Sequence, residues 1–152
     1  MKYIEIYIIT INPKSKLGQF YTTNYEYILQ HMNIPDDKQI IIEPFVGNGD
    51  LLHFINNVEN YTIECYDIEP KIENTTKQET LKNPPYLARN KNKDKFLYDR
   101  YKCNDLYKCF LTNIIENTCS GGIVILPLNF ICSIRKQDIY LRKKFLSKYS
   151  II

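Results

Sequence analysis

The sequence predicts an α/β protein built on a parallel β-sheet with helices on both faces. Three apolar runs are continuous enough for strands buried on both sides: "IIIEPF" from residue 40, "YTIECYDI" from residue 61 and "IVILPLNFI" from residue 123. Segments of helical length separate or follow these runs, as expected of strand–helix–strand units. With 152 residues and 44% hydrophobic content, the chain has the size of one domain with its own core.

The first part of the chain predicts either a strand or a frayed start from Tyr3 to Ile11, and then a loop that contains Pro13. A short helix from Tyr25 to Met32 follows, because apolar residues recur there at helical spacing. Thr23 and Asn24 are both suited to cap its N-terminus.

The middle of the chain predicts a strand over residues 38–45, a helix over residues 50–58 and a second strand over residues 61–68. Residues 69–82 are polar and carry no strand signal.

The second half begins with residues 87–102, which are basic and predict a loose loop. A helix over residues 106–118 is expected next, capped by Asn104 or Asp105 and ended by glycines. A third buried strand, closed by Pro127, is expected in the apolar run over residues 123–131, and a basic amphipathic helix over residues 133–149.

Composition limits the classes of function. The net charge of +3 is too small to demand a nucleic-acid partner by itself. The five cysteines form no C-x-x-C pair, so we expect neither a metal site nor a disulfide framework, and a reducing compartment is the simplest setting. We expect no membrane partner, because no apolar stretch approaches the roughly 20 residues of a membrane span. A signal peptide is not expected either.

A glycine loop follows the first buried strand and carries the clearest chemistry. Gly47 and Gly49 let the backbone approach a ligand at the carboxyl end of the sheet. Asp67 ends the next strand, about 20 residues on, at the spacing where a carboxylate binds a ribose, although a strand-end cap is the alternative. Glu43 would repel a pyrophosphate but suits a cation. A nucleoside with a positively charged tail, such as S-adenosylmethionine, satisfies all three features.

A stiff loop, Asn83-Pro84-Pro85-Tyr86, lies past the middle of the chain. Two adjacent prolines fix the backbone and remove two donors, so the loop belongs to neither a helix nor a central strand. A rigid turn is the simplest interpretation of the pair by itself.

Together these segments resemble an amino-methylating, adenine-N6 DNA methyltransferase of the restriction–modification or viral type. "LGQFYTT" from residue 17, "EPFVGNGDLL" from residue 43, "YDIEPK" from residue 66 and "NPPY" from residue 83 stand in that family's order. The resemblance implies a Rossmann-like S-adenosylmethionine-dependent fold and double-stranded DNA with a flipped-out adenine as partner. It implies a cofactor site formed by Gln19, Phe20, Tyr21, Thr22, Glu43, Pro44, Phe45, Gly47, Gly49, Asp67 and Ile68. It implies a catalytic loop formed by Asn83, Pro84, Pro85 and Tyr86, and no metal.

The catalytic loop suits this chemistry because an aromatic exocyclic amine is a poor nucleophile. The Asn83 amide oxygen and the Pro84 carbonyl would accept the amine hydrogens and free the nitrogen lone pair, while Tyr86 would stack on a flipped base. Basic residues that follow the loop would lie where DNA phosphates pass, or would form a solvated loop: Arg89, Lys91, Lys93, Lys95, Arg100 and Lys102.

Two features depart from this family. The polar residues 74–82 replace the apolar strand expected before the catalytic loop, which indicates an internal deletion, and the family's last strands and target-recognition region are missing after residue 152. We therefore expect an extension over residues 1–17, a partial and incomplete catalytic domain over residues 18–152, and dependence on a separate specificity subunit or a missing C-terminal region. The isolated chain should bind the cofactor but methylate DNA little.

Two alternatives stay open: a protein glutamine-amide methyltransferase, and a cofactor-binding pseudoenzyme without turnover. The expected location is the cytoplasm or another reducing compartment, in a bacterium or a virus-infected cell.

Overall fold

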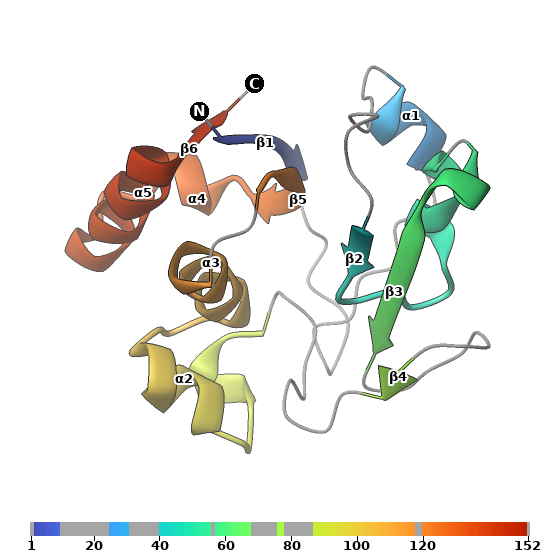
Figure 1. Ribbon diagram of the computed structural model, residues 1–152. Helices are drawn as coiled ribbons and strands as arrows, with labels where there is room; N and C mark the ends of the chain where they lie inside the picture. The colour runs from blue at the N-terminus through green and yellow to red at the C-terminus, as the bar shows by residue number, and fades with distance from the viewer. Residues whose placement is uncertain are drawn as a thin grey trace. The chain divides into compact units, whose positions relative to one another are not determined.

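The chain forms two compact units in this computed structural model (Figure 1). One unit is Phe20–Asn83, and the other combines Met1–Gln19 with Pro84–Ile152. The structure describes residues 2–9, 25–30, 40–55, 57–67, 76–77, 87–117 and 120–151. Both units contain helices or helical turns together with parallel strand pairs, so the fold is mixed and loosely α/β.

The first unit contains a small parallel sheet in the order β2-β3-β4. β2 (Ile40–Glu43) and β3 (Thr62–Asp67) confirm the two strands expected from the apolar runs. Their register pairs Glu43 with Cys65, so both strands end at the same edge of the sheet. α1 (Tyr25–Leu29) confirms the short helix expected there, with Leu29 buried.

Two expectations for this unit are wrong. Residues 50–58 do not form one continuous α-helix: the chain makes η1 (Asp50–Phe54), a 3₁₀ helix, and later η2 (Val58–Asn60). Asn57 between them adopts left-handed backbone angles (φ 56°), which asparagine tolerates and which interrupt a helix. The polar stretch also does contain a strand, because the two residues of β4 (Thr76–Lys77) pair with the end of β3. Backbone hydrogen bonds at a sheet edge need no apolar side chains.

The second unit contains a parallel sheet with β1 (Lys2–Ile9) in the middle. β5 (Gly122–Pro127) pairs with one edge of β1, and β6 (Tyr149–Ile151) pairs with the other. β1 confirms the predicted first strand. The strand in the third apolar run ends at Pro127, as expected, because proline cannot donate to a further ladder bond. α4 (Asn129–Cys132) follows it.

Helices complete this unit. α3 (Leu106–Glu116) confirms the capped helix, and the Asp105 side chain accepts a hydrogen bond from the Tyr107 N–H at its N-terminus. α5 (Lys136–Lys148) confirms the basic helix, although Tyr149, expected in its last turn, belongs to β6.

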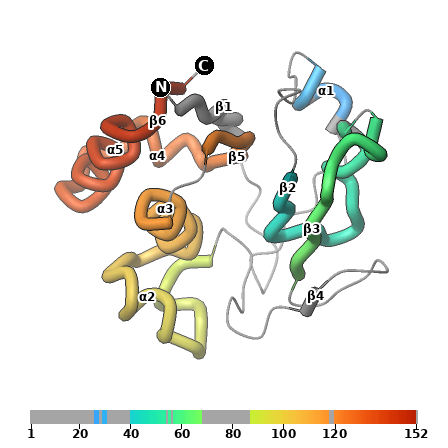
Figure 2. Tube along the Cα trace, viewed as in Figure 1, coloured from blue at the N-terminus to red at the C-terminus, as the bar shows by residue number. Residues whose placement is uncertain are grey.

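Residues 87–102 are folded rather than loose. They contain η3 (Arg89–Lys91) and α2 (Phe96–Tyr101), and α2 packs against α3 (Figure 2). The Tyr98 side chain is only 1% exposed, and its hydroxyl donates to the Leu87 carbonyl at 2.9 Å. Burial raises the pKa of this phenol to about 12. The buried side chains of Leu87 and Tyr98 therefore hold this otherwise basic segment in a folded structure.

The main core of this unit joins α3, β5, α4, α5 and β6. Phe145 packs edge-on against Phe130 with ring centroids 5.6 Å apart and lies 5.2 Å from the Tyr149 ring. The buried residues of this core are Tyr107, Leu111, Leu126, Phe130, Leu141, Phe145 and Tyr149.

Candidate functional site

The candidate site lies at the carboxyl ends of β2 and β3, where parallel sheets bind ligands. Glu43 is the last residue of β2 and Asp67 is the last residue of β3. Because the two strands are parallel and adjacent, both carboxylates lie at one edge of the sheet. The loop from Pro44 to Gly49 begins at this edge.

The loop is held to the end of β3 by two hydrogen bonds. The Gly47 N–H donates to Asp67 Oδ2 at 2.8 Å, and the Val46 N–H donates to the Tyr66 carbonyl at 3.0 Å. Gly47 (φ 53°) and Gly49 (φ 83°) both adopt left-handed angles that disfavour residues with a Cβ atom. The two glycines are therefore required by the shape of the loop.

The donors of this loop have a different role from the expected one. The sequence suggests that glycine N–H groups approach a ligand, but the Gly47 N–H is bonded to Asp67 and the Gly49 N–H donates to the Val46 carbonyl at 2.7 Å. These two donors serve the chain itself. The loop thus offers a ligand its shape and two nearby carboxylates rather than a pair of N–H groups for a phosphate.

Glu43 contributes a partly buried carboxyl group whose Oε1 accepts a hydrogen bond from the Phe45 N–H at 3.1 Å. Burial raises the pKa of Glu43; the hydrogen bond from Phe45 opposes this change, and the charge of Asp67 adds to it. A positive group bound beside these two carboxylates would be attracted by both and would favour the ionised form of Glu43.

Cys65 is the partner of Glu43 in the strand register. Burial and the charge of Glu43 raise the pKa of its thiol. A thiol that holds its proton this firmly is a poor nucleophile, so the site contains carboxylates but no activated cysteine on β3.

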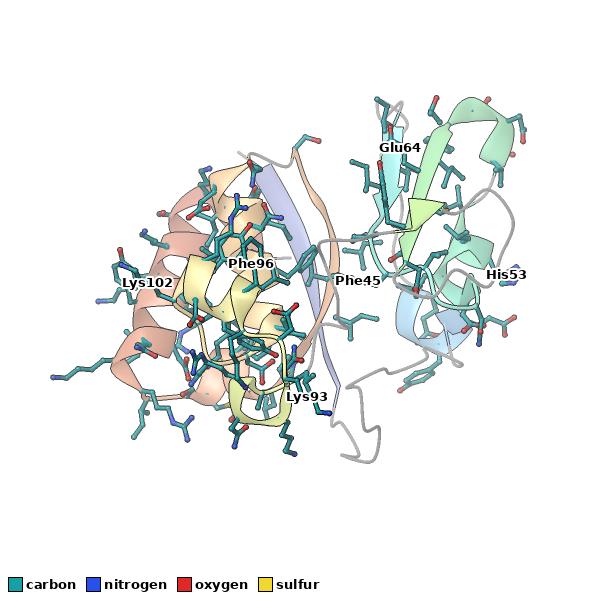
Figure 3. All side chains as sticks on the ribbon, turned by 90° about the horizontal axis from the view of Figure 1, so that it is seen from below. Phe45, His53, Glu64, Lys93, Phe96 and Lys102 are labelled. Carbon is teal, nitrogen blue, oxygen red and sulfur yellow. The ribbon has the colours of Figure 1, made fainter. Side chains whose placement is uncertain are left out.

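The opposite face of β3 carries a separate polar pair. The Tyr66 hydroxyl donates to Glu64 Oε2 at 2.9 Å, and this bond raises the pKa of Tyr66. Successive residues of a strand point to opposite faces, so Glu64 and Tyr66 share one face and Asp67 lies on the other. Figure 3 labels Glu64 on β3 and Phe45 on the loop after β2.

The structure brings together six of the predicted site residues: Glu43, Pro44, Phe45, Gly47, Gly49 and Asp67. The other cofactor residues, Gln19, Phe20, Tyr21, Thr22 and Ile68, lie outside the described residues. The predicted catalytic loop Asn83, Pro84, Pro85 and Tyr86 also lies outside them.

Sequence reasoning missed one residue of the loop. Val46 is buried, and its N–H supplies the second link to β3. The sequence did carry a signal for this role, because Val46 is an apolar residue inside a turn. A buried side chain of this kind anchors a loop to the core and holds its shape.

The chemistry of these side chains suits a ligand that carries a positive charge and sugar hydroxyl groups. Glu43 and Asp67 provide negative charge for a cationic tail and acceptors for sugar hydroxyls, and the two donors that would favour a phosphate are engaged in the loop. In the described part of the chain, no group of three or more His, Cys, Asp and Glu side chains is placed to hold a metal ion. No described helix is long and apolar enough to cross a membrane.

Comparison with known proteins gives no relative. No family model, no curated protein and no solved structure matches the chain.

Proposed function

We propose that the chain binds S-adenosylmethionine at the carboxyl ends of β2 and β3 and transfers its methyl group to the exocyclic amine of adenine in DNA. The hydrogen bond from the Gly47 N–H to Asp67 carries the proposal, because it joins a glycine loop to the acidic end of the neighbouring parallel strand. A Rossmann-like methyltransferase domain is the fold that this proposal implies.

The binding residues have distinct roles. Glu43 attracts the positively charged part of the ligand and is itself kept in its ionised form by that charge. Asp67 holds the loop through Gly47 and lies where the resemblance places the ribose. The Asp67 carboxylate would therefore both hold the loop in its shape and bind the ribose of the ligand.

The transfer step rests on the sequence Asn83-Pro84-Pro85-Tyr86. When bound, S-adenosylmethionine supplies an electrophilic methyl group. The amide oxygen of Asn83 and the carbonyl of Pro84 accept hydrogen bonds from the adenine amine and hold its lone pair toward the site. Tyr86 stacks on the extruded base, which favours the flipped state.

Calorimetric titration with S-adenosylmethionine is the first test, and we expect saturable binding with one site. Labelled cofactor and unmethylated genomic DNA test the transfer. We expect slow incorporation as methyladenine that disappears in Asn83→Ala, while cofactor affinity stays within about twofold because this acceptor contacts the target and not the cofactor. Tyr86→Phe should keep much of the activity and Tyr86→Ala should lose most of it.

Product analysis separates the alternatives. Label in a peptide glutamine amide, with none in DNA, would assign a protein methyltransferase in place of the DNA enzyme. Cofactor binding without any transfer would assign a pseudoenzyme. Absence of cofactor binding would overturn the whole proposal.

A further inference from the structure

The outer surface of α5 carries an unusual charge distribution. Asp138 is the only acidic residue of this helix. Six cationic residues lie on the helix or directly before it: Arg135, Lys136, Arg142, Lys143, Lys144 and Lys148. Asp138 is 6% exposed, and its oxygens bond Lys108 Nζ at 2.5 Å and Ser133 Oγ at 2.6 Å. The one negative charge of α5 is therefore buried and neutralised inside the unit, and the solvent side of the helix is positive.

Two of the six cations donate hydrogen bonds to backbone carbonyls of the unit. Arg142 donates to the Phe130 carbonyl at 2.8 Å, and Lys148 donates to the Ile115 carbonyl. Three exposed lysines, Lys136, Lys143 and Lys144, have no ion-pair partner among the described residues.

These lysines surround an exposed aromatic ring. Tyr140 is 61% exposed, and Lys144 Nζ lies 4.9 Å from its ring centroid. Lys136 and Lys143 are seven residues apart, so they share a helix face and are separated by about 10 Å along the axis. That distance is close to three base-pair steps along the axis of duplex DNA, at about 3.4 Å per step.

The basic stretch that the sequence singled out is different. Arg89 pairs with Asp99 at 2.6 Å, Arg100 lies 5.5 Å from the Tyr101 ring, and Lys95 donates to the carbonyls of Arg89 and Asn92. Three of its cations are thus engaged locally. The remaining exposed cations, Lys91, Lys93 and Lys102, provide a matched comparison, and Figure 3 labels two of them, Lys93 and Lys102.

We propose that the outer face of α5, formed by Lys136, Tyr140, Lys143 and Lys144, binds the sugar–phosphate backbone of duplex DNA without reading its sequence. Charge complementarity selects a polyanion. A membrane is disfavoured because a helix that lies in a membrane needs its apolar face for insertion, and the apolar face of α5 is used in the core through Leu141 and Phe145. The inference deepens the proposed function by naming the surface that holds the duplex.

The test measures binding of the full chain to a fluorescent duplex of arbitrary sequence between 50 and 200 mM salt, without cofactor. In the triple variant Lys136→Gln/Lys143→Gln/Lys144→Gln, the slope of log K against log salt should become shallower by about 2–3, since each lost phosphate contact contributes about 0.9. Affinity at 0.1 M salt should fall on the order of a hundredfold.

The matched control is Lys91→Gln/Lys93→Gln/Lys102→Gln, which removes the same charge. It should change the slope by less than half as much, and circular dichroism should show the same thermal transition for both variants. An unchanged slope in the α5 variant, or an equal loss in the control, would overturn the proposal, as would binding of the wild type to phosphatidylserine vesicles but not to DNA.

The cofactor titration keeps this inference distinguishable from the proposed function. The α5 variant should bind S-adenosylmethionine like the wild type. Loss of DNA binding with intact cofactor binding supports the surface, whereas DNA binding without any cofactor binding would overturn the methyltransferase proposal alone.

Discussion

Replacing Asp67 by alanine removes the carboxylate that holds the loop after β2. The Gly47 N–H then loses an acceptor at 2.8 Å, and the ligand loses the acidic group at the end of β3. A hydrogen bond to a charged group contributes about 1.5–3 kcal/mol. Because part of that loss falls on the loop before any ligand binds, S-adenosylmethionine affinity should weaken by about 1–3 kcal/mol, or roughly 5- to 150-fold.

Two further variants separate charge from shape. Asp67→Asn keeps an oxygen that can accept from Gly47 and should weaken binding less than alanine does. Glu64→Gln makes the same change of charge on the same strand but on the opposite face, where Glu64 bonds Tyr66. It should leave affinity within about twofold, since its bond does not reach the loop.

These expectations are tested by titration calorimetry of the three variants and the wild type, with thermal unfolding measured in parallel. If Asp67→Ala binds like the wild type, or if Glu64→Gln weakens binding equally, the assignment of this strand end to the cofactor is wrong.

Three other substitutions test the described structure. Gly47→Val should weaken cofactor binding and lower stability by about 1–2 kcal/mol, because a β-branched residue disfavours the left-handed angles at this position; Gly47→Asn should cost less in the same titration and melting experiments. Lys108→Met leaves Asp138 buried without its cation and should cost about 3–5 kcal/mol in urea unfolding, whereas the double change Lys108→Met/Asp138→Leu should cost less. Burial raises the pKa of Asp105 to about 6, so the folded state binds this proton more tightly than the unfolded state does and the wild type loses stability as pH rises from about 4 to about 6. Asp105→Asn keeps a capping side chain but cannot titrate, so its stability relative to the wild type should increase by on the order of 2 kcal/mol over that range; a difference that does not change with pH would contradict the assignment.

β1, β2, β3, β5 and the two long helices were predictable because their signals are local. Continuous isoleucine-rich runs predicted β2 and β3, and a capping aspartate before an apolar face predicted α3. The interrupted helix after Gly49 was not predictable in this way, because the apolar residues fit a helix and the backbone angle of Asn57 decided otherwise.

The missed elements depend on contacts between distant residues. α2 exists because Tyr98 is buried and bonds the Leu87 carbonyl, although lysines and arginines are frequent in the segment over residues 87–102. β6 has only three residues and exists because β1 offers a free edge. The average polarity of a segment predicts neither the contact between Tyr98 and Leu87 nor the pairing of β6 with β1.

The position of the glycine loop and Asp67 at the ends of adjacent strands was predictable, but the hydrogen bonds between them were not. The spacing between the glycine loop and Asp67 correctly placed both at the ends of adjacent strands. The direction of the Gly47 N–H toward Asp67, in place of a ligand, follows from the backbone angles of the loop, and sequence spacing does not specify those angles.

The central position of β1 has a consequence for the time course of synthesis. Its two partners begin at Gly122 and Tyr149, so β1 leaves the ribosome well over a hundred residues before either of them. At about 5–20 residues per second, this strand waits on the order of 5–25 s without its sheet. An isoleucine-rich segment exposed for that period is a target for chaperones and for self-association, so the yield of folded protein should depend more on the rate of translation than on the final stability of the sheet.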